Sequence, residues 1–342
     1  MSVGRNAAGT EQAGVVRGVH ASLFSLSRCH DESVTSRWRT LNDEDREREY
    51  SPSSCVGGNI DAFLTAYAEK SANARADCAA ADSAVIEVRY GAASSQTIDL
   101  VVPTATQNPT PLLVFIHGGY WQALSKLDSF FAAPECLSHG VAYAAVDYTL
   151  APHASLDEIV DECRLAVRAL RDAAPSHNID PQQIIVSGSS AGAHLTAMVG
   201  LESADAWRPA AIALVSGVYE LEPLIGLSIN EAVQLDTTSA HRNSPIFADL
   251  EGVPPTLIAY GHNETAEFKA QSDALGERLI QAGVDVVNIE IPERNHFDIV
   301  FDLCDEDSLL GAEIFRLTER VNASLVTSRV PVDSQAWPGS KR

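Results

Sequence analysis

Short apolar runs recur through most of this chain, and each has the length and the β-branched or aromatic content that are typical of a buried strand. They are residues 112–116, 141–146, 184–186, 210–215, 255–260 and 284–291. Stretches of helical character separate several of these runs. Strands that alternate with helices predict an α/β fold with a doubly wound, mostly parallel sheet and helices on both of its faces.

The clearest helix is predicted over residues 156–173, because its apolar positions repeat every three or four residues and form one stripe. Ser155 and Glu158 have the spacing of a capping box at its start. Residues 60–76 and 267–281 are two further predicted helices. Such helices supply the outer layers that a doubly wound sheet needs.

Segments outside this alternation predict how the chain is divided. Residues 84–90 and 97–102 are strand-like and predict an antiparallel opening of the sheet. Residues 219–248 show no strong period and are the predicted lid over a pocket, while the mixed charge run at 43–49 predicts a solvated segment without a functional role. The expected parts are an N-terminal extension that is disordered or associated with the cap (1–48), one large α/β domain (49–326) and a disordered tail (327–342).

Charge and composition narrow the class of partner. The 342 residues carry a formal net charge of −22, which repels the phosphates of nucleic acids and anionic membrane surfaces. No apolar run approaches the roughly 20 residues of a transmembrane helix, and residues 1–10 lack the apolar core of a signal peptide. We therefore predict a cytoplasmic protein whose partner is a small molecule, with neither nucleic acid nor membrane as a partner and with a homodimer left open.

The six cysteines lack the pattern of a metal site or of a disulfide framework. They are scattered without C-x-x-C or mixed His/Cys ligand spacing, so we expect free, mostly buried thiols and no structural metal. Their positions are Cys29, Cys55, Cys78, Cys136, Cys163 and Cys304.

Residues 186–192 contain the pattern G-x-S-x-G directly after a strand-like run. A strand that turns sharply into a helix exposes such a serine hydroxyl at the carboxyl edge of the sheet, and small neighbours permit the turn. The N-terminus of the helix then favours negative charge at that point. Ser190 is therefore the predicted nucleophile. The alternative is an ordinary loop or a tight helix packing, in which small residues also gather.

A second tract, H-G-G-Y-W at residues 117–121, follows the apolar run at 112–116. A nucleophile that attacks a carbonyl needs donors aimed at the oxygen that becomes negative, and glycines let backbone N–H groups approach that oxygen. We predict that the N–H groups of Gly118, Gly119 and Ala191 form this oxyanion hole. The alternative is that the two glycines only close a turn.

The remaining catalytic groups should follow in the chain order of serine, acid and histidine. His296 lies just after the last strand-like run and is the predicted base, while Glu264 lies just after the preceding run and is the first choice for the acid. Glu267 is the second choice, although it is expected inside the next helix and facing solvent. His262, beside Glu264, is expected to be a surface or loop histidine.

Several other residues near these tracts have a structural and a functional interpretation. Tyr120, Trp121 and Phe297 are candidate substrate contacts, and each can also serve as part of the core or of the pocket wall. His194 is expected to be a packed histidine on the helix after the serine. His117 is expected to brace its loop rather than transfer protons.

Taken together, these tracts resemble the serine-dependent kynurenine formamidase (arylformamidase) group of α/β-hydrolases, which is related to hormone-sensitive-lipase-like esterases. The resemblance covers roughly residues 50–325. Two departures stand out: the family often has His or Asp where this chain has Ser189, and its acid is more often Asp than the Glu264 found here. The tracts are residues 49–53, 117–121, 188–195, 264–272 and 295–298.

The resemblance implies an α/β-hydrolase fold with a small cap, a triad of Ser190, His296 and Glu264, and no cofactor or metal. It also implies hydrolysis of an N-formyl aromatic amide such as N-formylkynurenine, a step in tryptophan breakdown. A carboxylesterase for short acyl esters is the nearest alternative, because the sequence does not show the size of the acyl pocket. A third alternative is a catalytically silent binding protein of the same fold, although this chain retains all three triad candidates.

Overall fold

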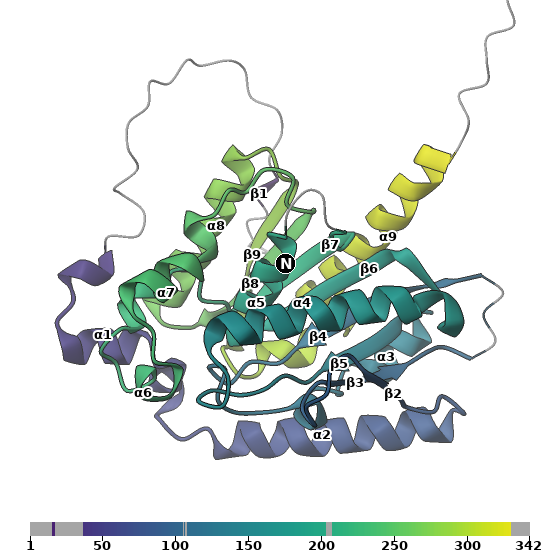
Figure 1. Ribbon diagram of the computed structural model, residues 1–342, viewed down its shortest axis with the longest axis horizontal. Helices are drawn as coiled ribbons and strands as arrows, with labels where there is room; N and C mark the ends of the chain where they lie inside the picture. The colour runs from purple at the N-terminus through teal and green to yellow at the C-terminus, as the bar shows by residue number, and fades with distance from the viewer. Residues whose placement is uncertain (1–15, 18–36, 105, 107, 203–206, 330–342) are drawn as a thin grey trace, which may run out of the picture.

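The apolar runs form the strands of one sheet that passes through the middle of the molecule (Figure 1). The computed structural model describes residues 16–17, 37–104, 106, 108–202 and 207–329. Within these residues the strand order is β1-β9-β8-β7-β6-β4-β5-β3-β2. The strands are β1 (Val16–Arg17), β2 (Ile86–Arg89), β3 (Thr97–Val101), β4 (Thr110–Ile116), β5 (Ala142–Val146), β6 (Ile179–Ser189), β7 (Ala211–Val215), β8 (Thr256–Asn263) and β9 (Val286–Asn295).

The direction of the strands confirms the predicted sheet. Strands β4 to β9 pair with one another in parallel. Strands β2 and β3 form an antiparallel pair, and β3 lies antiparallel to β5, so the chain opens on an antiparallel ribbon as expected. At the opposite edge, β1 pairs antiparallel with β9. The carboxyl ends of the parallel strands therefore share one edge, where ligands of such sheets bind.

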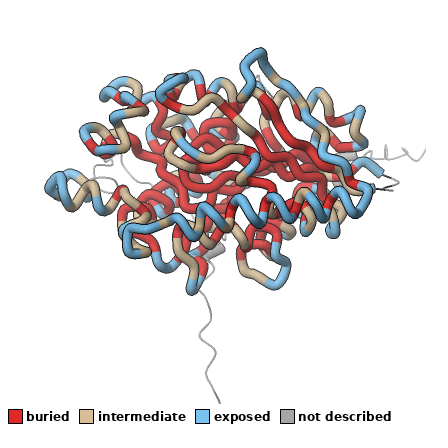
Figure 2. The backbone as a smooth tube through the Cα atoms, turned by 90° about the horizontal axis from the view of Figure 1, so that it is seen from below, coloured by how far each residue is buried: buried red, intermediate tan, exposed pale blue. Residues whose placement is uncertain are grey.

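Helices cover both faces of this sheet. Along β4, Leu112, Val114 and Ile116 join one buried cluster with residues of α4, α5 and α8, whereas Leu113 and Phe115 join a second cluster with residues of α2, α3 and α9. This alternation is what a strand buried on both faces produces, and Figure 2 shows the buried strands inside exposed outer helices. The α-helices are α1 (Asp43–Glu49), α2 (Asp61–Ala80), α3 (Ala133–Ser138), α4 (Leu156–Ala173), α5 (Ala191–Gly200), α6 (Asn230–Val233), α7 (Thr237–Arg242), α8 (Ala266–Gln281) and α9 (Leu309–Arg329).

The predicted helix over 156–173 is present as α4 with the same bounds. Its capping box forms as expected, because the Ser155 hydroxyl accepts from the backbone N–H of Glu158 while the Glu158 carboxylate accepts from the backbone N–H of Ser155. Short 3-10 helices connect several elements. They are η1 (Arg37–Thr40), η2 (Pro52–Val56), η3 (Lys126–Asp128), η4 (Ala174–His177), η5 (Glu222–Leu224), η6 (Pro245–Phe247) and η7 (Ile299–Asp302).

The charge run at 43–49 is solvated, as expected, since none of its residues is buried. It forms α1, where the Asn42 side chain accepts from the N–H of Asp45 and the acidic residues fill the first turn. Glu47 of this helix also accepts a hydrogen bond from the backbone N–H of Ser228 at 3.0 Å. Contacts with a segment about 180 residues away help to fix this helix, and local composition does not show them.

The other predicted divisions are only partly visible. Residues 219–248 contain η5, α6, α7 and η6 and contribute to the wall of the cavity described below. Of the predicted extension, residues 37–48 form η1 and α1, whereas 1–15 and 18–36 lie outside the described residues. Most of the predicted tail, residues 330–342, also lies outside them. The division of the chain into these parts stays a prediction.

Candidate active site

The turn between β6 and α5 places one serine at the carboxyl edge of the sheet. Ser190 follows β6 directly and has φ 58° and ψ −122°, which non-glycine residues rarely adopt. Its neighbours Gly188 and Gly192 lie too close to other backbone for a side chain, since a Cβ on Gly192 would lie 2.0 Å from the carbonyl oxygen of Ile116. The G-x-S-x-G tract thus forms the sharp strand-to-helix turn that its pattern predicts.

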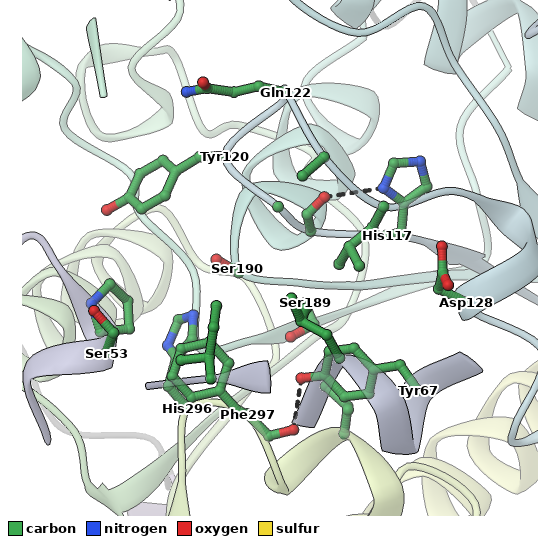
Figure 3. Close-up of a pocket in the computed structure, with 18 of the residues that line it drawn as sticks. Ser53, Tyr67, His117, Tyr120, Gln122, Asp128, Ser189, Ser190, His296 and Phe297 are labelled. Carbon is green, nitrogen blue, oxygen red and sulfur yellow. Dashed lines mark hydrogen bonds between the residues drawn. The ribbon is translucent and has the colours of Figure 1, made fainter. Parts of the chain in front are cut away.

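Ser190 and His296 line the same cavity, which has a volume of about 500 Å³ (Figure 3). Within the described part of the chain, the Oγ atom of Ser190 makes no hydrogen bond, and the residue stays partly accessible from the cavity. Contacts between a nucleophile and a base often tighten only when a substrate binds. Aromatic side chains form much of the wall, namely Tyr50, Tyr67, Phe115, Tyr120, Phe131 and Phe297.

The loop after β4 lines the same cavity through Gly118 and Gly119. Among the described residues, the N–H groups of Gly118, Gly119 and Ala191 donate to no other group. Gly119 has φ +90°, and a Cβ there would lie 2.3 Å from the carbonyl oxygen of Ala123, so the loop needs glycine at this position. Gly118 and Gly119 thus line the same cavity as Ser190, and Ala191 follows Ser190 directly, while their role as oxyanion donors stays a prediction.

His117 contacts this loop and stabilises it. Its Nδ1 atom lies 2.9 Å from the carbonyl oxygen of Gly118, and its ring stacks on Tyr148 with 4.2 Å between the centroids. The Tyr148 hydroxyl in turn donates to the carbonyl oxygen of His117 at 3.1 Å. On the other side of the ring, Nε2 lies 3.6 Å from a carboxylate oxygen of Asp147. These contacts fit the bracing role expected from the sequence.

The predicted acid, Glu264, and the predicted base, His296, form a hydrogen bond. The Nδ1 atom of His296 lies 2.9 Å from Oε2 of Glu264, and both side chains are buried. The other oxygen of Glu264, Oε1, accepts from the Ser216 hydroxyl at 2.6 Å and from the backbone N–H of Gly261 at 2.6 Å. Three hydrogen bonds thus fix the carboxylate, and the carboxylate fixes the ring of His296.

Glu267 lies elsewhere, and the expectation that it faces solvent was wrong. It lies in the first turn of α8 but is only 3% exposed. Its carboxylate accepts from the Tyr50 hydroxyl at 3.2 Å and lies 3.2 Å from Nε of Arg37. Burial raises the pKa of this carboxyl above its usual value. The N-terminal segment covers the residue, and helix periodicity alone does not reveal that cover.

The three candidate substrate contacts do not all lie in the cavity. Tyr120 and Phe297 line the cavity, whereas Trp121 is fully buried outside it, so the predicted contact of Trp121 with a substrate is wrong. A positive φ of 61° at Trp121 turns the residue into the core, where its indole packs edge-on against His194 with 5.1 Å between the centroids. Phe297 stacks on Phe63 at a centroid distance of 5.2 Å.

Sequence reasoning missed three contributors to the site. Ser216 follows β7 directly, and its place after an apolar run was a usable signal, since the carboxyl ends of parallel strands meet at one edge. Glu47 and Asp128 line the cavity from α1 and η3. Neither stands next to a recognisable motif, so no local signal marked them.

The other histidines behave as structural or surface residues. Nε2 of His194 lies 2.7 Å from the carbonyl oxygen of Asn243, and burial lowers the pKa of His194 to about 4, so the ring is neutral at pH 7. His262 is exposed and pairs with Glu290 at 2.9 Å. In the described ranges, the cysteines are free, no group of three His, Cys, Asp or Glu side chains could hold a metal ion, and no helix has the length and apolar content to cross a membrane.

Comparisons with known proteins show which proteins this chain is similar to. The BD-FAE family model matches residues 98–213. A kynurenine formamidase from Salmo salar is 32% identical over 290 residues, which cover 80% of this chain and 95% of the relative. One from Danio rerio is 31% identical over 295 residues, with 82% and 98% covered. A crystal structure from Silicibacter sp. TM1040, described as a "putative thioesterase", is 29% identical with a TM-score of 0.67 and covers 78% of this chain and 97% of its own.

Proposed function

We propose a function for this chain from the fact that it belongs to the kynurenine formamidase family of α/β-hydrolases. The proposed reaction is the hydrolysis of an N-formyl aromatic amide of the N-formylkynurenine type. In this proposal Ser190 is the nucleophile, His296 the general base and acid, and Glu264 the residue that holds the imidazole. The N–H groups of Gly118, Gly119 and Ala191 form the oxyanion hole.

The reaction follows from the positions of these groups. Ser190 Oγ attacks the formyl carbon while His296 accepts its proton, and the three proposed N–H donors stabilise the carbonyl oxygen as it becomes negative. His296 then gives the proton to the departing aromatic nitrogen, which leaves as the amine. A water molecule, deprotonated by His296, attacks the formyl-serine ester and releases formate and the free serine. The sum is formamide plus water to amine plus formate.

One observation carries the proposal. Ser190, His296, Gly118 and Gly119 line one cavity, and the carboxylate that orients His296 is itself held by two further hydrogen bonds. Protonating an amide nitrogen demands a well-oriented acid, because an aniline anion leaves less readily than an alkoxide or phenoxide. The aromatic wall of the cavity suits an aromatic amine. Removing one oxyanion donor from such a site typically costs about 10²- to 10³-fold in rate.

A short-acyl carboxylesterase is the second candidate. The same serine, histidine and oxyanion donors serve ester hydrolysis, and the similarity to the "putative thioesterase" favours this candidate. The two functions differ in the leaving atom and in the size of the acyl group, not in the machinery. They must therefore be distinguished by substrate preference.

The test is kcat/KM of the purified protein on N-formyl-L-kynurenine, p-nitrophenyl acetate and p-nitrophenyl butyrate, with Ser190→Ala as the blank for contaminating hydrolases. We expect strong preference for the formamide and loss of activity in the variant. Turnover of the esters alone would move the function to the carboxylesterase. Silence on all three substrates would leave both functions unsupported.

The proposal also covers the partners, the cellular location and the oligomeric state of the enzyme. A small molecule is the partner, and a cytoplasmic location without nucleic acid or membrane partners stays a prediction that cell fractionation can test. Size-exclusion chromatography with light scattering decides between a monomer and a homodimer.

A further inference from the structure

The charges that line the cavity are all of one sign. Among the described lining residues there are two carboxylates, Asp128 and Glu47, and neither Lys nor Arg. A carboxylate on a substrate would therefore lose water on entering without gaining an ion pair, which is unfavourable. Walls of low dielectric constant also concentrate the field of the two acids inside the cavity.

Asp128 is available for a ligand. One of its oxygens accepts from the Ser125 hydroxyl at 2.9 Å, and no cation in the described part of the chain forms an ion pair with it. The neighbouring basic residue, Lys126, is buried and pairs instead with Asp99 at 2.7 Å and with Glu87 at 3.3 Å. In Figure 3, Asp128 lies on the opposite side of Ser190 from Tyr120.

Glu47 is a second carboxylate without an ion pair, at another part of the cavity wall. Its carboxylate accepts from the N–H and the hydroxyl of Ser228, and it too has no ion pair with any described cation. The two arginines of the same helix are used locally, since Arg46 pairs with Asp43 at 3.1 Å and Arg48 with Asp45 at 2.7 Å. The negative charge of Glu47 therefore remains uncompensated beside the cavity.

We propose that this cavity selects its substrates by charge, favouring acyl compounds with a cationic arm over neutral ones and disfavouring anionic ones, with Asp128 and Glu47 as the residues that set this selectivity. The inference rests on the proposed function, because it concerns the substrate of the same site. For an amino-acid substrate it means that the ammonium group, not the carboxylate, is bound inside the cavity.

The experiment uses three formanilides with para arms of similar size: an aminoethyl arm, a propyl arm and a carboxyethyl arm. We expect kcat/KM to fall in that order, with the aminoethyl compound about 30-fold or more above the carboxyethyl compound, because an ionic hydrogen bond is gained in one case and repulsion is met in the other. Asp128→Asn and Glu47→Gln should each reduce this ratio about three- to tenfold.

Glu69→Gln is the matched control, because it removes the same charge from an exposed position on α2 that does not line the cavity. It should leave the ratio unchanged. If a cavity variant fails to fold, the wild-type enzyme still tests the proposal, since about 1 M salt shortens the Debye length to about 3 Å and should reduce the ratio.

Equal rates for the aminoethyl and carboxyethyl compounds would overturn the proposal, as would an unchanged ratio in the Asp128→Asn, Glu47→Gln double variant. If none of the formanilides is hydrolysed, the proposed formamidase function fails instead. The same three arms on phenyl acetate then decide the charge selectivity separately.

Discussion

The carboxyl edge of the sheet and the wall that faces it across the cavity are built in different ways. At the edge, Ser190, Ser216, Glu264 and His296 each follow directly after a strand, namely β6, β7, β8 and β9. Neighbouring parallel strands hold these positions through continuous backbone pairing. Backbone hydrogen bonds between strands, which side-chain substitutions leave in place, therefore position these four residues.

The opposite wall is held by individual side chains. Residues 37–56 and 219–248 form short helices that meet through contacts such as Trp38 Nε1 with Glu220 at 3.0 Å and the hydrogen bonds from Ser228 to Glu47. Each such contact contributes only about 0.5–1.5 kcal/mol. The difference teaches that changes at the edge should alter kcat, while changes in the wall should alter KM and selectivity.

The largest expected effect separates two glutamates, one at the edge and one that contacts the wall. Glu264→Gln should lower kcat by about 10² to 10⁴, because an amide cannot hold the imidazole in the required tautomer. Glu267→Gln, which alters a contact with the N-terminal segment, should change kcat less than about threefold. Steady-state kinetics on the preferred substrate measures both. The reverse result would place the acid at Glu267 and break the distinction between edge and wall.

The second prediction concerns His194, which joins α5 of the edge to the wall through Asn243. Burial lowers the pKa of His194 to about 4, below the value of about 6.5 in an unfolded chain. Between these values the unfolded state binds more protons, so stability rises with pH and is lost as pH falls from about 6.5 toward 4. The loss amounts to about 3 kcal/mol at most.

His194→Gln should remove this part of the pH dependence, which urea unfolding at several pH values can measure. The variant should lose stability at pH 7, where the packed ring is missing, and should lose less than the wild type between pH 6.5 and 4. Parallel stability curves for the two proteins over that range would show that the histidine is not buried in its neutral form.

The same contrast explains what the sequence could predict. Strands, the helix at 156–173 and its cap depend on local spacing, so each was predictable. The positions of Ser190, Glu264 and His296 also followed, since each lies a few residues after the end of an apolar run and parallel strands end at one edge. The structure brings these three residues together, while their catalytic roles remain the proposal.

Three features near the cavity were not predicted, for one physical reason. The helix at 43–49, the burial of Glu267 and the position of Trp121 all depend on contacts between segments far apart in the chain or on an unusual backbone angle. Hydrophobic periodicity reports only which face of an element is apolar. It does not report which distant segment covers a polar side chain, so a glutamate at the start of a helix was taken to face solvent.

The third prediction concerns Ser216, whose hydroxyl holds Glu264. Ser216→Ala should lower kcat about tenfold with little change in KM, because the carboxylate loses one hydrogen bond but keeps that of Gly261. Ser216 has φ 52°, so Ser216→Gly is the matched variant that removes the hydroxyl and also relieves the backbone. Equal losses in both variants assign the effect to the hydroxyl. A loss in only one of them would assign it to the backbone.

The smallest expected effect concerns the hydrogen bond between Tyr120, in the loop after β4, and Tyr50 of the N-terminal wall. The Tyr120 hydroxyl donates to the carbonyl oxygen of Tyr50 at 2.5 Å, so it ties the loop after β4 to the N-terminal wall. Tyr120→Phe keeps the ring that lines the cavity and removes only this bond. We expect KM to rise about two- to fivefold, with kcat nearly unchanged, because the wall loosens while the glycine N–H groups keep their places. A fall in kcat at constant KM would show instead that the wall positions the oxyanion donors, and the two regions would then act as one.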